Sequence, residues 1–417
     1  MGEYTDVFVN ENFYCQAAAA RAVAPRTIPQ SSVMTTDCDF LVIGAGVSGA
    51  AAAWELAALG RTILLEMEDQ PGYHSSGRSA ALYTPNYGPT VVRQICQAAG
   101  DFFNAPPQGF AEHPLLSPRG ALTLGIDDPE GAMDALLKDA PPEHPIAEIS
   151  LDRAIELCPL IRPGVFRRAI YEPGVMDMDA GAIHQGYLKG FKARGGRLAV
   201  SAAVTALERK AGTWTAVTAI ERFRAPVVVN AAGAWADRVG GLAGVPTIGL
   251  QPCLRTVILV EAPPEFCGPR QPVGEVVETW HYFKPEAGRI LASPGDETPV
   301  DPMDAYPDDM VMAELADYLE RHTLLKIERI LRSWAGLRSF VPDHCPVAGF
   351  DPRAEGFFWL AGQGGYGIMM SPVLGRAAAA LIDSGQLPED LRERGVTPAD
   401  LAPDRAALRE SVASIAG

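Results

Sequence analysis

The sequence has 417 residues, of which 47% are hydrophobic and 21% are charged, and its formal net charge is −16. A chain of this size is expected to bury a large core and to form two or three domain-sized units. The acidic balance disfavours a nucleic-acid partner, because a phosphate backbone repels such a surface. No apolar run approaches the roughly 18 residues of a membrane-spanning helix.

The seven cysteines are scattered singly and form no CxxC pair. This pattern argues against a disulfide framework and against a thiolate metal site, and it favours a reducing compartment. We therefore predict a cytoplasmic protein without a metal site. Peripheral association with the inner face of the membrane is left open.

The first residues differ in character from the rest. They carry Glu3, Asp6 and Glu11, with no basic residue before Arg21, which is unlike a secretory signal. Met34 directly precedes the first expected strand and would make a natural start. We expect residues 1–36 to form a flexible N-terminal extension, or else an ordered arm used in assembly.

A glycine-rich turn between two apolar runs is the strongest local signal. The pattern predicts a buried parallel strand over 40–43, a turn over 44–49, a helix over 50–59 and a second strand over 62–65. Gly44 allows the tight turn, Gly46 lets a pyrophosphate approach the backbone, and Gly49 lets helix and strand pack closely. The phosphates would lie at the helix N-terminus.

Glu66 follows the second strand at the spacing (roughly 20 residues) of an acid that binds a ribose. The unit therefore predicts a dinucleotide site. In the polar loop that comes next, small residues around Gly77 suit a close approach to a cofactor, and Arg78 is expected to meet a phosphate.

Shorter elements follow in the middle of the chain. The pattern predicts helices over 90–104, 129–137, 151–157, 179–194 and 310–322, and strands over 121–126, 198–200, 226–230, 257–260, 279–283 and 333–337. The strand over 226–230 ends in the small residues of the 231–234 segment, which is typical of a sheet edge that faces a ligand.

A second glycine-rich loop lies near the other end of the chain. A strand over 357–361 runs into Gly362–Gly367 and then a helix over 369–383. A loop at a helix N-terminus can hold negative charge on a ligand. Because the two glycine loops are far apart in sequence, the nucleotide domain must be discontinuous, with a strand-rich second domain inserted over the cofactor.

Three separated stretches together resemble the D-amino-acid oxidase family of FAD-dependent amine oxidoreductases. They are Gly44–Gly49 with Glu66, Ser75–Ser79, and Trp334–Arg338 with Gly362–Gly367. The similarity runs from about Phe40 to Leu401 and is strongest to the bacterial D-arginine dehydrogenase branch. It implies bound FAD and an α/β fold, with a discontinuous Rossmann-like FAD-binding domain plus a mixed-sheet α+β substrate domain.

The resemblance also implies boundaries. The FAD-binding domain would take residues 37–112, 172–247 and 333–388, and the substrate domain would take residues 113–171 and 248–332. Residues 389–417 would form a C-terminal tail.

Site residues are carried over from the same resemblance. The cofactor would contact Gly44, Gly46, Val47, Ser48, Gly49, Glu66, Ser75, Ser76, Arg78, Ser79, Ala80, Ala232, Gly233, Trp235, Gly364, Gly365, Tyr366, Gly367 and Ile368. Arg338 would pair with the substrate α-carboxylate through a bidentate guanidinium fork, and Arg255 and Tyr282 would complete that site. Tyr83 and His74 would line the pocket, and Glu112 would face a cationic side chain.

The implied activity is oxidative deamination of D-amino acids, basic ones such as D-Arg and D-Lys included. A hydride would pass from Cα to flavin N5, giving a 2-oxo acid and ammonia, and the final electron acceptor would be O2 or a quinone of a respiratory chain. Alternatives are an oxidase of glycine- or sarcosine-like amino acids, a 2-hydroxy-acid dehydrogenase, and a noncatalytic FAD-bound subunit of a larger complex. Cys253 and Leu254 replace basic residues of the D-arginine dehydrogenase branch, which leaves the substrate range open. No oligomeric state is predicted.

Overall fold

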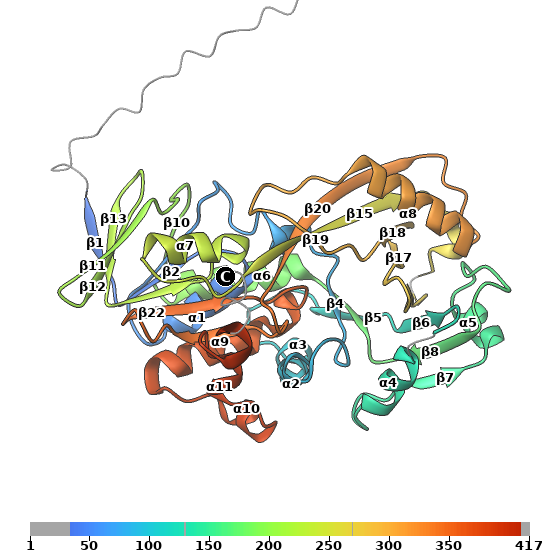
Figure 1. The fold of residues 1–417 in the computed structure, drawn as a ribbon, viewed down its shortest axis with the longest axis horizontal. Helices are drawn as coiled ribbons and strands as arrows, with labels where there is room; N and C mark the ends of the chain where they lie inside the picture. Colours follow the sequence, from blue (N-terminus) through green and yellow to red (C-terminus); the bar gives the residue numbers. More distant parts are fainter. Residues whose placement is uncertain (1–33, 129–130, 269, 410–417) are drawn as a thin grey trace, which may run out of the picture. The chain divides into compact units, whose positions relative to one another are not determined.

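The computed structural model describes residues 34–128, 131–268 and 270–409 (Figure 1). The predicted extension therefore lies outside the described residues up to position 33. Its last residues, however, belong to the fold, because β1 (Thr35–Asp37) pairs in parallel with β13 (Arg222–Ala225). The described residues from Thr35 onward form one compact unit, so the division into two domains stays a prediction.

A six-stranded sheet forms the centre of the nucleotide-binding part. Its order is β10 (Arg197–Ala199), β3 (Thr62–Leu65), β2 (Phe40–Ile43), β14 (Val227–Asn230), β22 (Phe357–Ala361) and β21 (Val347–Phe350). The first five strands are parallel and β21 is antiparallel to β22. Parallel strands are buried on both faces, which explains their unbroken apolar runs.

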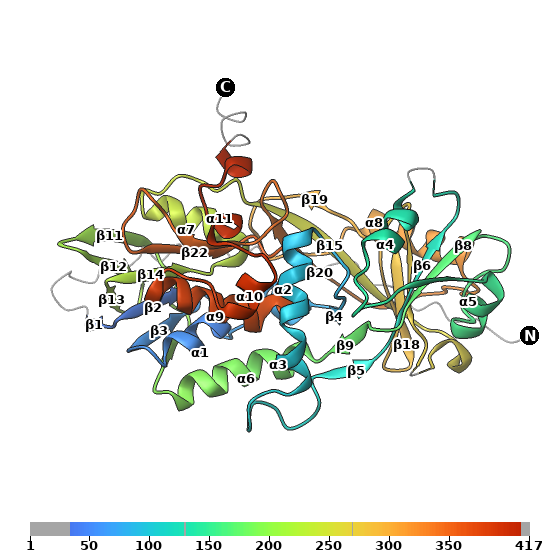
Figure 2. The same cartoon turned by 90° about the horizontal axis from the view of Figure 1, so that it is seen from below.

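Each face of this sheet has its own core. Val42 packs with α1 (Val47–Leu56), α6 (Ala180–Ala193) and α9 (Gly367–Ser384), whereas Leu41 packs on the opposite side with α7 (Ala236–Leu242). Figure 2 shows α1, α6 and α9 on one side of the sheet. Alanines at positions 50–53 are almost completely buried, and they let α1 approach α9 so closely that a Cβ at Gly375 would lie 3.0 Å from that of Ala51.

A nine-stranded mixed sheet makes up most of the remaining part. Its order is β19 (Thr298–Pro299), β15 (Gln251–Val260), β18 (Arg289–Ser293), β17 (Tyr282–Glu286), β16 (Val273–Val276), β6 (Ala121–Gly125), β8 (Arg168–Glu172) and β7 (Ala147–Ile149), with β20 (Ile330–Phe340) also paired to β15. Helices α5 (Leu151–Leu157) and α8 (Asp309–His322) cover one face. β20 runs across the boundary predicted between residues 332 and 333, because the ladder with β15 continues to Phe340.

Two small sheets and several short elements complete the unit. One sheet has the order β1, β13, β12 (Thr213–Val217) and β11 (Ala206–Lys210), and the other β4 (Leu82–Tyr83), β9 (Met176–Met178) and β5 (Leu116–Pro118). The short helical elements are α4 (Ala132–Asp139), η1 (Ser75–Arg78), η2 (Gly233–Trp235) and η3 (Pro264–Phe266).

Two further predictions need correction. The helix expected over 90–104 is divided into α2 (Thr90–Ala98) and α3 (Gly100–Asn104), where Gly100 approaches the hydroxyl group of Tyr83. The expected C-terminal tail belongs to the core as far as it is described. It contains α10 (Glu389–Glu393) and α11 (Pro398–Leu401), buries Leu391 and Leu401, and ties Arg405 to Asp343 through a 2.6 Å ion pair.

Among the described residues, no helix combines the length and apolar character needed to cross a bilayer.

Neighbouring glycines on α7 test the packing of the sheet's second core. A Cβ at Gly240 would lie 2.5 Å from Cη2 of the fully buried Trp359, whereas one at Gly241 would meet no atom within 4 Å. We expect Gly240→Ala to lower the free energy of unfolding by about 1–3 kcal/mol. Gly241→Ala should leave it unchanged or raise it by up to about 1 kcal/mol, because alanine favours the helix. Urea unfolding of both variants measures the difference, and equal effects would contradict the packing.

Candidate cofactor and substrate site

The loop between β2 and α1 is shaped by two glycines. Gly44 has φ = +101°, and a Cβ there would lie 2.5 Å from the carbonyl oxygen of Ala231 at the end of β14. A Cβ at Gly49 would lie 1.8 Å from the carbonyl oxygen of Gly44. The first glycine therefore permits the turn, and the second permits the contact between helix and turn, which are the packing roles that the sequence predicts.

Gly46 has a different environment. A Cβ there would meet only Oγ of Ser76, at 3.2 Å, so the backbone at this position is open to a ligand. Helix α1 begins at the next residue and has neither a side-chain N-cap nor an acidic residue in its first turn. The N–H group of Val47 donates to Oγ of Ser76 (2.9 Å), and the other N–H groups of the first turn lie beside Gly46 together with the positive end of the helix dipole, an arrangement that suits a phosphate.

Glu66 is tied to this loop. Its carboxylate accepts hydrogen bonds from the backbone N–H groups of Ala45 (2.9 Å) and Glu68 (3.0 Å). Burial raises the pKa of Glu66, and these backbone bonds act in the opposite direction. The predicted contact of Glu66 with a ribose stays a prediction.

A cavity of about 710 Å³ opens beside the loop. The predicted cofactor residues that line it are Val47, Ser75, Ser76, Arg78, Ser79, Ala80, Gly364, Gly365, Gly367 and Ile368. Helix α9, which begins at Gly367, also lacks a side-chain N-cap, and a Cβ at Gly367 would lie 3.9 Å from Cγ1 of Val47. The N-termini of two long helices therefore meet at one cavity, and this donor set fits an anionic dinucleotide such as FAD.

The other predicted cofactor residues do not line the cavity. Gly44, Gly49 and Glu66 shape or support the loop, Gly46 directly precedes the lining residue Val47, and Ser48 lies in the first turn of α1. Tyr366 is buried against Tyr87, with ring centroids 5.3 Å apart. Ala232 lies beside Gly44, and Gly233 and Trp235 follow it in η2.

The guanidinium group of Arg78 is committed to the protein. It donates hydrogen bonds to the carbonyl oxygens of Ala305 (2.8 Å) and Ala335 (3.1 Å) and forms an ion pair with Asp304. These contacts connect η1 to β20. The expectation that Arg78 meets a phosphate is therefore not supported, because its donors already have acceptors.

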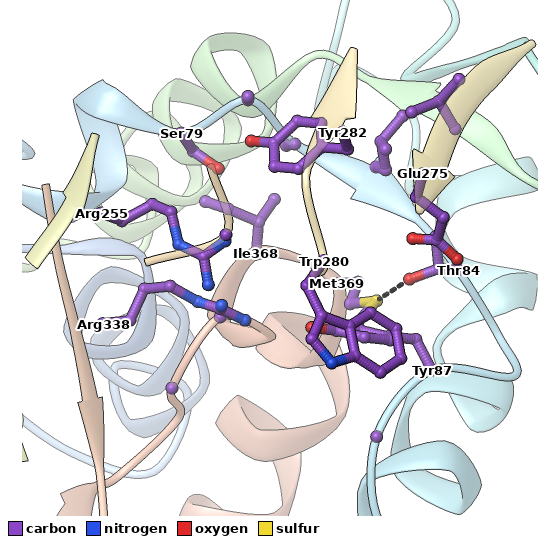
Figure 3. A pocket seen from close by; sticks show the side chains of 18 of the residues that line it. Ser79, Thr84, Tyr87, Arg255, Glu275, Trp280, Tyr282, Arg338, Ile368 and Met369 are labelled. Carbon is purple, nitrogen blue, oxygen red and sulfur yellow. Dashed lines mark hydrogen bonds between the residues drawn. The ribbon is translucent and has the colours of Figure 1, made fainter. Parts of the chain in front are cut away.

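Arg255 and Arg338 approach the cavity from neighbouring strands. Arg255 is paired with Gly336 and Arg338 with Cys253 in the ladder of β15 and β20, so both arginines lie on the same face. Figure 3 shows both side chains turned into the cavity. Oε1 of Glu297 accepts from Arg338 Nη1 at 3.1 Å and lies 3.4 Å from Arg255 Nη2.

The pKa values of the two guanidinium groups are shifted in opposite directions. Burial and the positive charge of Arg338 lower the pKa of Arg255. Burial also acts to lower the pKa of Arg338, but Tyr87 and Glu297 outweigh it and raise that pKa. Among the described residues, Nε of Arg255 has no hydrogen-bond partner. The pair can therefore donate to a further carboxylate.

Aromatic side chains border the space next to the arginines. Tyr282 lines the cavity as predicted, and Tyr87 and Trp280 line it as well (Figure 3). Tyr87, Trp280 and Glu297 are not among the site residues predicted from the sequence. Tyr87 and Glu297 lie in loops, where no periodicity marks the direction of a side chain. Trp280 lies within the strand predicted over 279–283, but β17 begins only at Tyr282, and Trp280 has a positive φ of +56° in the turn before it.

Three residues predicted for the substrate pocket, Tyr83, His74 and Glu112, do not line this cavity. On the short strand β4, Leu82 lines the cavity while Tyr83 points to the core, where its hydroxyl group donates to the carbonyl oxygen of Cys96 (3.2 Å). Successive side chains of a strand face opposite ways, so when Leu82 faces the cavity, Tyr83 cannot line it as predicted. His74 is bonded to Glu68 at 2.9 Å, and Glu112 is exposed to solvent.

Two glutamates on the wall of the large sheet were also missed. Glu172 and Glu275 both line the cavity. Burial and the nearby charge of Glu275 raise the pKa of Glu172 to about 7, and burial likewise raises the pKa of Glu275. The signal in the sequence is an acid at position 275 within an otherwise apolar strand.

Comparisons with known proteins agree with this geometry. The family model described as "FAD dependent oxidoreductase" (DAO) matches residues 39–381. Glycine oxidase from Geobacillus kaustophilus is 25% identical over 398 residues, which cover 89% of this chain and 97% of that protein.

Solved structures share the fold. L-Proline dehydrogenase from P. horikoshii has a TM-score of 0.74 at 22% identity, covering 87% of this chain and 100% of that one. L-Amino acid deaminase from Proteus vulgaris has a TM-score of 0.74 at 16% identity, covering 89% and 98%. At these identities the likeness concerns the fold alone.

The open backbone at Gly46 can be tested with a methyl group. Gly46→Ala should fold normally, because its Cβ meets only one hydroxyl oxygen, but it should lower FAD affinity by about tenfold or more because the methyl group occupies the phosphate space. Gly49→Ala should instead destabilise the protein. Flavin absorbance after dialysis and the unfolding midpoint separate the two effects, and full retention of FAD by Gly46→Ala would contradict the assignment.

The raised pKa of Glu172 predicts a pH dependence of stability. The folded protein holds the proton of Glu172 up to about pH 7, whereas the unfolded chain releases it near the ordinary glutamate pKa of 4.5. The contribution of Glu172 is therefore present below about pH 4.5 and is lost as the pH rises to about 7. Urea unfolding between pH 4 and 8 should show that Glu172→Gln removes this loss, whereas the exposed control Glu314→Gln should not. Parallel curves for wild type and Glu172→Gln would refute the prediction.

Proposed function

Since the chain belongs to the DAO family of FAD-dependent oxidoreductases, we propose that it oxidises the carbon that carries the amino group of an amino acid, with D-amino acids as its substrates. FAD, when bound, supplies the hydride acceptor. The products are a 2-oxo acid and ammonia, after water hydrolyses the imino acid.

One observation carries the proposal. Arg255 and Arg338 turn into the same cavity that receives the N-termini of α1 and α9, whose N-cap residues give no side-chain cap. The arginine pair would take the substrate carboxylate through charge-assisted hydrogen bonds. A carboxylate site beside a dinucleotide site is what the oxidation of an amino acid requires.

Orientation is the main contribution of these residues. With its carboxylate fixed by Arg338 and Arg255 and its flank packed on Tyr282, the substrate can present only one face of Cα to the acceptor. The Cα–H bond breaks with its electron pair, and the amine lone pair forms the C=N bond. The substrate thereby loses two electrons, and O2 or a quinone would be their final acceptor.

No strong base is needed when the amine binds in its neutral form. His74 is bonded to Glu68 and does not line the cavity, so the proposal assigns it no proton. The N–H groups of the 364–367 loop, at the N-terminus of α9, would favour negative charge that develops on the cofactor side of the site.

Glycine and its N-methyl derivatives are the second candidate substrates. The similarity to a glycine oxidase over 89% of this chain favours this alternative. The same carboxylate site would bind glycine and its derivatives. Anaerobic bleaching of the flavin band by D-amino acids, L-amino acids, sarcosine and 2-hydroxy acids separates the candidates. Bleaching by D-amino acids with L-isomers inert is the expected result.

Replacing Arg338 tests the carboxylate site. Arg338→Met should lower kcat/KM for any amino acid by about a hundredfold or more, with KM raised and kcat lowered, because the substrate loses its orienting contact. Arg329→Met is the matched control, since Arg329 is exposed and pairs with the exposed Glu261. Near-wild-type turnover by Arg338→Met would exclude the assignment. No bleaching by any amino acid, with FAD bound, would exclude the proposed function itself.

A further inference from the structure

We propose that Glu172, Glu275 and Asn86 form a subsite for a cationic group at the far end of the substrate, such as the guanidinium or ammonium group of a basic side chain. This inference rests on the proposed function, because it assigns the other end of the same cavity. It also replaces Glu112, the acid that the sequence resemblance assigns to this role.

The two glutamates share one face of the large sheet. Glu275 on β16 is paired with Thr123 of the central strand β6, and Glu172 on β8 is paired with Ala121 of the same strand. Ala121 and Thr123 are two positions apart and therefore point the same way. All four residues line the cavity, so the register of three strands places both carboxylates on one wall.

Asn86 gives independent evidence for a ligand site. It is 6% exposed and lines the same cavity. Its Nδ2 donates to Oε1 of Glu172 (2.9 Å) and to the carbonyl oxygen of His144 (3.0 Å), which fixes the direction of the amide. Among the described residues its Oδ1 has no hydrogen-bond donor. A buried acceptor without a donor is costly, and an N–H group of a ligand would satisfy it.

The glutamates likewise lack a basic partner in the described part of the chain. Glu275 accepts from the hydroxyl group of Thr123 (2.9 Å), and Glu172 accepts from Asn86. Arg93 also lines the cavity, but its guanidinium group pairs with Asp139 at 3.6 Å. The side-chain oxygens of two glutamates and one amide thus face the cavity, which is the complement of a cation with several donors. A bound cation favours the charged form of both carboxyl groups and so opposes the effect of burial on them.

The position of this wall relative to the arginines suits a long substrate. Glu275 is directly paired with Tyr282 of β17, and side chains paired in this way lie about 5 Å apart. Figure 3 shows Glu275 across the cavity from Arg255 and Arg338, with Tyr282 between them. A substrate with its carboxylate on the arginines would therefore extend past Tyr282 toward the acidic wall.

Binding of two non-oxidisable carboxylates tests the subsite without turnover. 5-Guanidinopentanoate carries a distal cation, and heptanoate is a carboxylate of similar length whose distal end is uncharged. The Kd of each is measured at pH 8 from the change in flavin absorbance of the FAD-loaded enzyme. Wild type should prefer the guanidino ligand, and Glu275→Gln and Glu172→Gln should each weaken its binding by roughly tenfold or more. Heptanoate binding should change by less than about threefold, which also reports that the variants are folded.

Two further variants sharpen the result. Glu314→Gln removes one exposed negative charge outside the cavity and should keep the wild-type preference. Equal Kd values for the two ligands in wild type, or an unchanged preference in both cavity variants, would overturn the subsite. Loss of preference in Glu112→Gln alone would overturn it in favour of Glu112. Flavin reduction by neutral D-amino acids in the same preparations tests the proposed function separately, because it does not depend on the acidic wall.

Discussion

The contact between the first glycine loop and the end of β14 leaves no room for a side chain, and the geometry of the cavity depends on it. Because Gly44 and Gly49 allow this contact, α1 begins at the carboxyl end of the parallel sheet. The connection then passes outward through hydrogen bonds. The N–H of Val47 donates to Ser76 (2.9 Å), and the hydroxyl group of Ser75 donates to the carbonyl oxygen of Leu337 (2.6 Å). Leu337 precedes Arg338, so the glycine loop and the arginine pair are held in one framework.

The cavity has an ordered distribution of charge. Helix N-termini face one region, two guanidinium groups a second and two carboxylates a third, with aromatic rings between them. An amino acid carries complementary groups at fixed separations, whereas a simple alcohol or amine does not. The overall charge of −16 therefore says little about what binds, because the local arrangement of charges decides it.

The sequence predicts the central sheet well because its signals are local. β2 and β3 have the bounds that their apolar runs indicate, and Gly44 and Gly49 have the predicted packing roles. The cavity was predicted only in part. Arg255, Tyr282 and Arg338 come together as the resemblance implies. Tyr83, in contrast, points to the core, and its direction could not be predicted because a strand as short as β4 shows no alternating pattern in the sequence.

The proximity of Glu172 and Glu275 could not be predicted from the sequence. Their proximity depends on how β8 and β16 align with β6, and these three strands are far apart in sequence. No local pattern specifies that register. The role of Glu112 as the specificity acid stays a prediction, and the structure adds only that this side chain is exposed and does not line the cavity.

Glu297 gives the arginine pair an internal competitor. Its Oε1 accepts from Arg338 and lies within reach of Arg255, and the side chain is 41% exposed. In the proposed function, a substrate carboxylate competes with Glu297 for Nη1 of Arg338 and Nη2 of Arg255, while Nε of Arg255 remains available to it. The free energy of binding is therefore smaller than the gain from two bare cations. Such an exchange keeps both guanidinium groups aligned between turnovers. The competition also disfavours small anions. Glu297 already gives the arginines a carboxylate, without the translational freedom that a free anion loses when it binds.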